Sequence, residues 1–182
     1  MENINICLFG AASSDIADIY LHEGEELGQE IGRRGHRLLY GGGTTGLMGA
    51  CAKGAYACGG EVTGIAPDFF DTEGVLNKDM GELILTETMH QRKKLMEEKA
   101  DAFIVCPGGI GTMDEFFQVL VLSSLGRKRA PIILYNICGY YDELIRFIDI
   151  SISKGFARPG IKDLFRVCSD PAEAIDKIEY FS

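Results

Sequence analysis

The chain alternates short apolar runs with longer segments of helical periodicity along its whole length, and this alternation limits the folds that it can adopt. Runs typical of strands lie at Asn5–Phe9, Arg37–Tyr40, Glu61–Ala66, Glu82–Thr86, Ala102–Cys106, Pro131–Tyr135 and Phe165–Cys168. Helices are predicted over about Ala17–Arg34, Leu47–Cys58, His90–Lys99, Met113–Leu125 and Tyr141–Lys154, with a last one beginning near Pro171. Because strands that alternate with helices form right-handed crossovers, we expect an α/β fold with a doubly wound, mostly parallel sheet, in a single domain of residues 1–182.

Composition excludes several classes of partner. The 27 acidic and 18 basic side chains give a net charge of −9, which argues against binding to nucleic acid or to an anionic membrane surface. No apolar stretch reaches the roughly 18 residues of a membrane span, and no signal-peptide pattern opens the chain, so we expect a cytoplasmic protein. The six cysteines form no C-x-x-C pair and no zinc-type cluster with histidine. We therefore expect reduced thiols and no metal site. We also expect no cofactor.

Three glycine-containing turns follow predicted strands, and parallel sheets bind ligands at that edge. The turns are Gly10-Ala11-Ala12-Ser13-Ser14, the segment from Gly41 to Gly46, and the segment from Pro107 to Gly111. In the second turn, Gly41, Gly43 and Gly46 match the dinucleotide fingerprint, so Gly42 and Gly43 are candidate ligand contacts. The alternative is that these glycines only allow close helix–strand packing. Glu61 has the spacing of the ribose-binding acid but begins its strand, which disfavours a dinucleotide-dependent redox enzyme.

The third turn opens the segment Pro107–Glu115, which has the sequence PGGIGTMDE. Its glycines Gly108, Gly109 and Gly111 predict a backbone nest that binds an anion at a helix N-terminus. Thr112 and Glu115 also match a T-x-x-E capping box, and capping alone would explain Glu115. The candidate ligand contacts in this segment are Gly108, Gly109, Ile110, Gly111, Thr112, Met113 and Asp114.

A second charged motif, Met89-His90-Gln91-Arg92-Lys93, begins the helix after the fourth predicted strand. Cations at a helix N-terminus oppose the helix dipole unless an anion lies nearby. This conflict favours Arg92 and Lys93 as ligand-binding residues.

These two motifs together resemble the Lonely Guy family of cytokinin riboside 5′-monophosphate phosphoribohydrolases, whose hallmarks are P-G-G-x-G-T-x-x-E and M-H-x-R-K. The similarity extends over nearly the whole chain, including Tyr40–Gly43, Gly46–Gly49 and Gly139-Tyr140-Tyr141. It implies a Rossmann-like homodimer that releases the free base from a nucleoside 5′-monophosphate. It also implies that Arg92 and Glu115 are catalytic, and that Glu73 is the nearest match to a substrate-contacting glutamate. The chain departs from the family at Gly10-Ala11-Ala12-Ser13, where relatives carry C-G-S-S.

The chemistry that the resemblance implies is consistent with these residues. Cleavage of an N-glycosidic bond builds oxocarbenium character on the ribose, which the Glu115 carboxylate could stabilise, or Glu115 could activate the attacking water. Arg92 could hold the phosphate or the departing base. Two other classes stay open: a non-catalytic nucleotide or cofactor carrier, and a redox enzyme. Relatives are also labelled lysine decarboxylases, but no lysine and acid here specifically match a pyridoxal site.

The predicted helix after the third turn is apolar on almost every side from Phe116 to Leu122, with Gln118 the exception. A helix that covers one face of a sheet needs only one apolar stripe. We expect the second stripe to pack against a symmetry-related helix of a homodimer. Burial under other helices of the same chain is the alternative.

Overall fold

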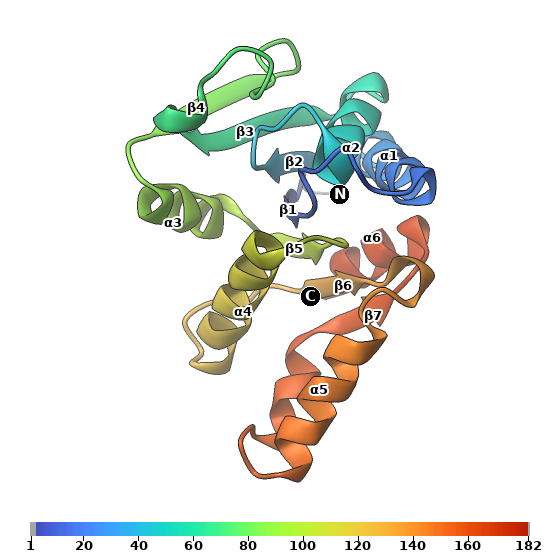
Figure 1. The fold of residues 1–182 in the computed structure, drawn as a ribbon. Helices are drawn as coiled ribbons and strands as arrows, with labels where there is room; N and C mark the ends of the chain where they lie inside the picture. The colour runs from blue at the N-terminus through green and yellow to red at the C-terminus, as the bar shows by residue number, and fades with distance from the viewer. Residues whose placement is uncertain (1–2, 182) are drawn as a thin grey trace.

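The computed structural model describes residues 3–181, which contain one parallel sheet ordered β4-β3-β2-β1-β5-β6-β7 (Figure 1). The predicted α/β class with a parallel, doubly wound sheet is confirmed, and every described pair of neighbouring strands is parallel. The strands are β1 (Asn5–Phe9), β2 (Arg37–Tyr40), β3 (Glu61–Pro67), β4 (Glu82–Thr86), β5 (Ala102–Val105), β6 (Ile132–Tyr135) and β7 (Arg166–Cys168).

Helices cover both faces of the sheet. They are α1 (Asp18–Arg33), α2 (Gly46–Ala57), α3 (Met89–Lys99), α4 (Ile110–Ser124), α5 (Asp142–Ser153) and α6 (Pro171–Glu179). Side chains of α1, α2 and α6 form one apolar core, and side chains of α3, α4 and α5 form the other, on the opposite side of the sheet in Figure 1. In the described residues, no helix is both long enough and apolar enough to cross a membrane.

The central strand β1 contributes to both cores because alternate side chains of a strand point to opposite faces. Ile6 and Leu8 lie in the first core, and Cys7 and Phe9 lie in the second. From β1 the chain adds β2, β3 and β4 on one side of the sheet, and it then adds β5, β6 and β7 on the other side of β1. The direction of strand addition therefore changes between the neighbouring parallel strands β1 and β5. The turns that follow these two strands therefore meet at the switch point of the sheet, where open α/β folds bind ligands.

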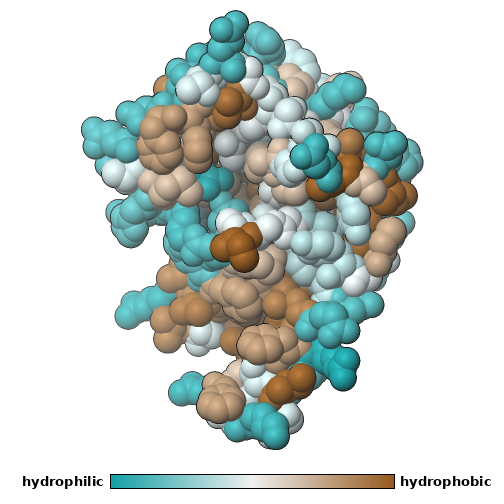
Figure 2. Space-filling view, in the orientation of Figure 1, coloured by the Kyte–Doolittle hydropathy of each residue, from teal (hydrophilic) through white to brown (hydrophobic). Residues whose placement is uncertain are grey.

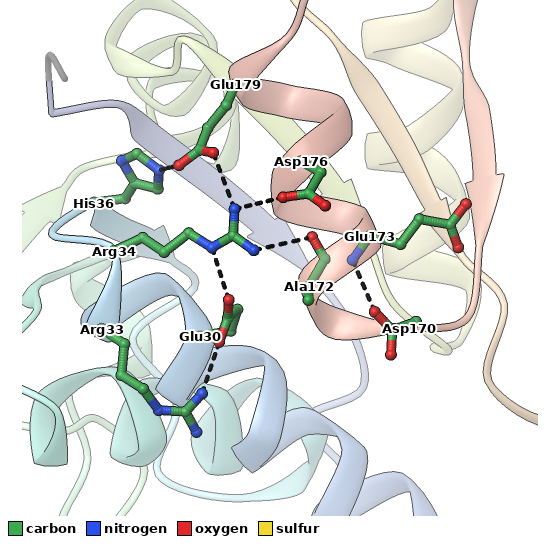
Figure 3. Close-up of polar contacts among 9 residues, drawn as sticks. All are labelled: Glu30, Arg33, Arg34, His36, Asp170, Ala172, Glu173, Asp176 and Glu179. Atoms are coloured by element: carbon green, nitrogen blue, oxygen red, sulfur yellow. Dashed lines mark hydrogen bonds and ion pairs between the residues drawn. The ribbon is translucent and has the colours of Figure 1, made fainter.

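Polar contacts join the last helix to the segment between α1 and β2, at the amino end of β2 (Figure 3). The Arg34 guanidinium, just after α1, donates to Glu30 at 2.7 Å, to Asp176 at 2.6 Å and to Glu179 at 2.9 Å. Glu179 also contacts the buried His36 ring, 3.0 Å from Nε2. This group of five residues, the Arg34 cluster, joins α6 to α1 and β2.

One side of α4 is left exposed by the residues that the structure describes. Phe117, Val121 and Leu125 are 37%, 52% and 67% exposed, whereas Phe116 and Val119 on the inner side are buried. Figure 2 shows apolar side chains gathered over the lower part of the molecule, where α4 and α5 lie in Figure 1. Burial of this second stripe by helices of the same chain, the alternative considered above, is therefore wrong.

Candidate active site

A cavity of about 360 Å³ opens at the switch point of the sheet. Its walls come from the turns after β1 and β2, the loop after β3, and the N-terminal turns of α3 and α4. The predicted site residues that line it are Gly43, Arg92, Gly109, Gly111, Thr112, Asp114 and Glu115. The fold thus brings both sequence motifs to one cavity.

Arg92 and Glu115 form an ion pair at the wall of this cavity, with 2.7 Å between Arg92 Nη1 and Glu115 Oε1. Each residue is only 9% exposed. Arg92 Nε also donates to the carbonyl oxygen of Ile65 on β3, at 3.1 Å. The guanidinium is therefore fixed from two sides, and it holds one oxygen of the Glu115 carboxylate in a defined position.

Burial raises the pKa of Glu115, although the neighbouring Arg92 charge acts in the opposite direction. A carboxylate with a raised pKa in a cavity is typical of groups that exchange protons or stabilise developing positive charge. The geometry and the pKa together distinguish Glu115 from the surface acids.

Two local features place Arg92. Thr88 and Gln91 form a capping box that begins α3, so Arg92 lies in the second turn and reaches inward. Gly41 lies directly under the guanidinium, since a Cβ added there would be 2.8 Å from Arg92 Nη2. The sequence motif T-x-x-Q could have predicted this capping box, whereas the role of Gly41 depends on a contact between distant segments.

The start of α4 differs from the prediction. The helix begins at Ile110 with Gly109 as its N-cap, three residues before the predicted Met113. Thr112 and Glu115 therefore lie inside the helix, and the capping-box explanation of Glu115 is wrong because the residue bonds Arg92 instead. Since Gly109 has no side chain, the first N–H groups of α4 have no side-chain cap.

The predicted backbone nest also needs correction. A nest alternates right- and left-handed residues, yet Gly108, Gly109 and Gly111 all lack the left-handed conformation. The N-terminus of α4 is still a candidate anion site. The space in front of it is open, because a Cβ added at Gly109 or Gly111 would meet nothing within 4 Å. Neither backbone conformation nor protein contact requires glycine at these two positions, which leaves room for a ligand.

Lys93 pairs with Asp114, with 2.8 Å between Nζ and Oδ2. The two cations at the start of α3 are thus both neutralised by adjacent acids at the start of α4. The conflict with the helix dipole, from which a bound anion was inferred, is relieved within the protein itself. Lys93 does not line the cavity, whereas Asp114 does.

The remaining predicted site residues lie outside the main cavity. Gly42 has a φ of 78° and packs against Gly64, so backbone conformation and packing both favour glycine there. Glu73 and Ile110 are exposed, and Met113 packs against the second core. Gly108 lines a smaller neighbouring cavity of about 170 Å³.

An apolar wall of the cavity was not predicted. Met48, Phe70, Val75, Leu76 and Met89 form much of the lining. The loop after β3 reaches the site because Asn77 N donates to Gly42 O at 2.8 Å and Thr44 Oγ1 donates to Gly74 O at 2.7 Å. No periodic pattern marks residues 68–80, so the sequence carried little signal for this wall.

The chain is similar to known proteins over most of its length. A family model described as "Possible lysine decarboxylase" matches residues 48–178. The chain is 36% identical to a probable cytokinin riboside 5′-monophosphate phosphoribohydrolase of Oryza sativa subsp. japonica, over 97% of this chain and 72% of that protein. It is 35% identical to a cytokinin riboside 5′-monophosphate phosphoribohydrolase of Arabidopsis thaliana, over 97% of this chain and 77% of the relative.

Solved structures with a similar fold include a molybdenum cofactor carrier protein of Chlamydomonas reinhardtii. Its TM-score is 0.73 at 24% identity, covering 99% of this chain and 98% of the other. A molybdenum cofactor binding protein of Rippkaea orientalis also has a TM-score of 0.73, at 22% identity, covering 98% and 97% of the two chains. At these identities the likeness establishes a common fold and nothing more.

Proposed function

Since this chain belongs to the family of cytokinin riboside 5′-monophosphate phosphoribohydrolases, we propose that it hydrolyses the N-glycosidic bond of a nucleoside 5′-monophosphate. The products are the free base and ribose 5-phosphate. The observation that carries the proposal is the buried pair of Arg92 and Glu115 on the wall of the switch-point cavity.

Glu115 supplies the negative charge that the reaction needs. As the bond to the base breaks, positive charge grows on the ribose, and a fixed carboxylate in a water-poor site stabilises it. The same carboxylate is able to orient and deprotonate the attacking water. Arg92 holds Glu115 in place through the 2.7 Å contact, and it is also near enough to the cavity to contact the phosphate or the departing base.

The phosphate is assigned to the N-terminus of α4. Uncapped N–H groups at a helix N-terminus bind anions, and Gly109 and Gly111 leave the approach open. The base then faces the apolar wall around Met48, Phe70 and Leu76. This wall suits a purine with an apolar substituent, in agreement with the substrates in the names of the rice and Arabidopsis relatives.

Two other functions have less support. A pyridoxal-dependent decarboxylase needs a lysine for its Schiff base, and none of the described residues that line the cavity is a lysine. A cofactor carrier, as among the similar solved structures, has no need for a buried, paired glutamate with a raised pKa.

Three further properties follow as parts of the proposal. We expect a homodimer through the exposed stripe of α4, because closed symmetric dimers are the commonest assemblies. We expect a cytoplasmic location, where the six free cysteines would stay reduced. The net charge of −9 disfavours nucleic acid and anionic membranes as partners.

The test is incubation of the protein with AMP and with N6-isopentenyl-AMP, followed by chromatography of the free base. We expect base release from at least one nucleotide, much slower release from the matching nucleoside, and inhibition by ribose 5-phosphate. The Glu115→Gln variant is the control for a contaminating hydrolase. If neither nucleotide yields free base above that control, the protein is not this hydrolase.

A further inference from the structure

Three successive carbonyl groups of the loop after β5 are each held by a donor from another part of the chain. Cys106 O accepts from the Tyr141 hydroxyl at 2.6 Å, and Gly108 O accepts from the Tyr140 hydroxyl at 2.8 Å. Pro107 O, between them, accepts from the backbone N–H of Ala11 at 3.0 Å. This arrangement fixes the direction of the chain immediately before α4 begins.

The two tyrosines are presented by a tight turn at the start of α5. Cys138 and Gly139 are both left-handed, with φ of 51° and 72°, and they turn the chain toward the loop after β5. Asn136 fixes the turn, since its Oδ1 accepts from Tyr141 N–H at 2.6 Å. Two adjacent left-handed residues are unusual, particularly where one is not glycine.

The surroundings of the rings keep the hydroxyls in place as donors. Tyr141 is 1% exposed, and burial raises the pKa of its phenol, so the hydroxyl stays protonated. The Tyr140 ring packs edge-on against Tyr141 and against Tyr20 of α1, with centroid distances of 5.0 Å and 6.1 Å.

Neither tyrosine lines the active-site cavity. Tyr140 and Gly108 line the smaller cavity of about 170 Å³, and neither lines the larger one. Gly111 lines the larger cavity, and Gly109 and Ala11 line both, so the two cavities adjoin at the start of α4. The Gly108 carbonyl thus has its partner, the Tyr140 hydroxyl, beside the smaller cavity, while Gly111 in the first turn of α4 lines the larger one.

From this geometry we infer that Tyr140 and Tyr141 are positioning residues for phosphate binding. A carbonyl oxygen turned toward the cavity would repel a phosphate, whereas N–H groups attract it. By holding the carbonyls of Cys106 and Gly108, the tyrosines fix the peptide groups before α4, and in a trans peptide the N–H of Gly109 points opposite to the held Gly108 carbonyl, toward the substrate. The inference rests on the proposed function in assigning the phosphate to this helix.

The test is the Tyr140→Phe variant, which removes one hydroxyl and retains the packing of the ring. Loss of one neutral hydrogen bond corresponds to about a fivefold to tenfold effect. We expect the KM for AMP and the inhibition constant of ribose 5-phosphate to rise by that factor, with kcat changed less than about twofold, since the phosphate is held equally in ground and transition states.

Tyr20→Phe is the matched control, because Tyr20 lines the same smaller cavity but is not a donor to the loop carbonyls described above. We expect its KM to equal that of the wild type. Tyr141→Phe is expected to raise KM as Tyr140→Phe does, with an additional loss of thermal stability from the buried carbonyl left without its donor.

A purely structural role gives a different result: kcat falls with the folded fraction while KM stays unchanged, and this would overturn the inference. Calorimetric titration with ribose 5-phosphate separates the inference from the proposed function. If the wild type binds ribose 5-phosphate and Tyr140→Phe weakens binding, the positioning role stands even when no base is released. If the wild type binds no ribose 5-phosphate, the inference is wrong.

Discussion

Glu115 and Arg92 form an ion pair and are both largely buried. Removal of either side chain therefore leaves an unpaired charge in the protein. The two sequence motifs were specific enough to single out both residues as candidates for catalysis. Their pairing could not be predicted, since 23 positions separate them and only the adjacency of α3 and α4 brings them together. The same holds for Gly41, whose missing side chain makes room for the Arg92 guanidinium.

The first prediction tests this pair. We expect Glu115→Gln and Arg92→Ala each to lower hydrolysis of the nucleotide by at least about 100-fold, because each removes a charge that acts on the transition state. Glu98→Gln, at an exposed acid of α3 that pairs with Lys94, is the control and should keep full activity. Near-wild-type turnover by Glu115→Gln, in a protein with a normal circular dichroism spectrum, would rule out the catalytic assignment.

The pH dependence follows from the raised pKa of Glu115. If the ionised carboxylate is the active form, activity is lost as the pH falls through this pKa, so the acid limb of kcat/KM lies above the ordinary glutamate value of about 4.3. Arg92→Met removes the charge that opposes the shift, so the acid limb of its residual activity moves to still higher pH.

Glu97→Gln controls for the other acid of this region whose pKa is raised by burial. Its pH–rate profile should match the wild type. An acid limb at or below the ordinary glutamate value, or one that moves with Glu97→Gln, would contradict the assignment to Glu115.

At the scale of single elements, the beginnings of α3 and α4 decide the geometry of the site. The sequence predicted both helices, but the start of α4 was placed at Met113, where Thr112 and Glu115 match a capping box with Thr112 as the N-cap. In the structure the first helical bond runs from Met113 N–H to Gly109 O, and three hydrogen bonds from distant segments fix the loop before the helix. Local sequence patterns alone do not contain this information.

Gly111→Ala separates stability from ligand binding in this element. A Cβ at this helical position meets no protein atom within 4 Å, so we expect the free energy of unfolding to rise by about 0.5–1 kcal/mol. Because Gly111 lines the cavity, the added methyl group should raise the KM for AMP about tenfold.

Gly160→Ala is the matched control, since Gly160 is exposed, lines neither cavity, and its added Cβ would only approach Asp163 at 3.9 Å. Its KM should be that of the wild type. Denaturant unfolding and steady-state kinetics on both variants give the two readouts. An unchanged KM for Gly111→Ala would mean that the substrate does not approach the start of α4.

At the scale of the whole molecule, the strands were predicted to within about one residue of their observed bounds, because runs of apolar residues and turn residues mark them locally. The order of the strands was not predictable from such local patterns. The strand order depends on the face of the sheet over which each connecting helix crosses. This order determines that the turns after β1 and β5 meet. Local sequence patterns also could not predict contacts between distant segments, such as those of the Arg34 cluster.

Arg34→Ala should destabilise the whole fold, because it breaks the contacts of α1 with Asp176 and Glu179 of α6 (Figure 3). The Arg34 side chain is 22% exposed, so we expect a loss of about 2 kcal/mol, below that of a fully buried pair. Arg33→Ala is the control: this side chain is 54% exposed and pairs only within its own helix, so the loss should be under about 0.5 kcal/mol. Equal denaturation midpoints for the two variants would show that the cluster does not hold α6.

The last prediction concerns assembly. The outer stripe of α4, with Phe117, Val121 and Leu125, is too apolar and too exposed to face water without cost, and the same helix carries Asp114 and Glu115 at its start. Packing of this stripe against its symmetry mate would bury the apolar side chains and restrict the motion of the helix that carries Glu115. We therefore expect light scattering to give twice the 19.9 kDa of one chain, and Val121→Glu to yield a monomer with reduced activity, because it places an unpaired charge in the interface. Tyr56→Glu, which adds the same charge at a half-exposed position of α2, should remain dimeric and active. A wild-type protein that is fully active as a monomer at micromolar concentration would contradict this account of the stripe.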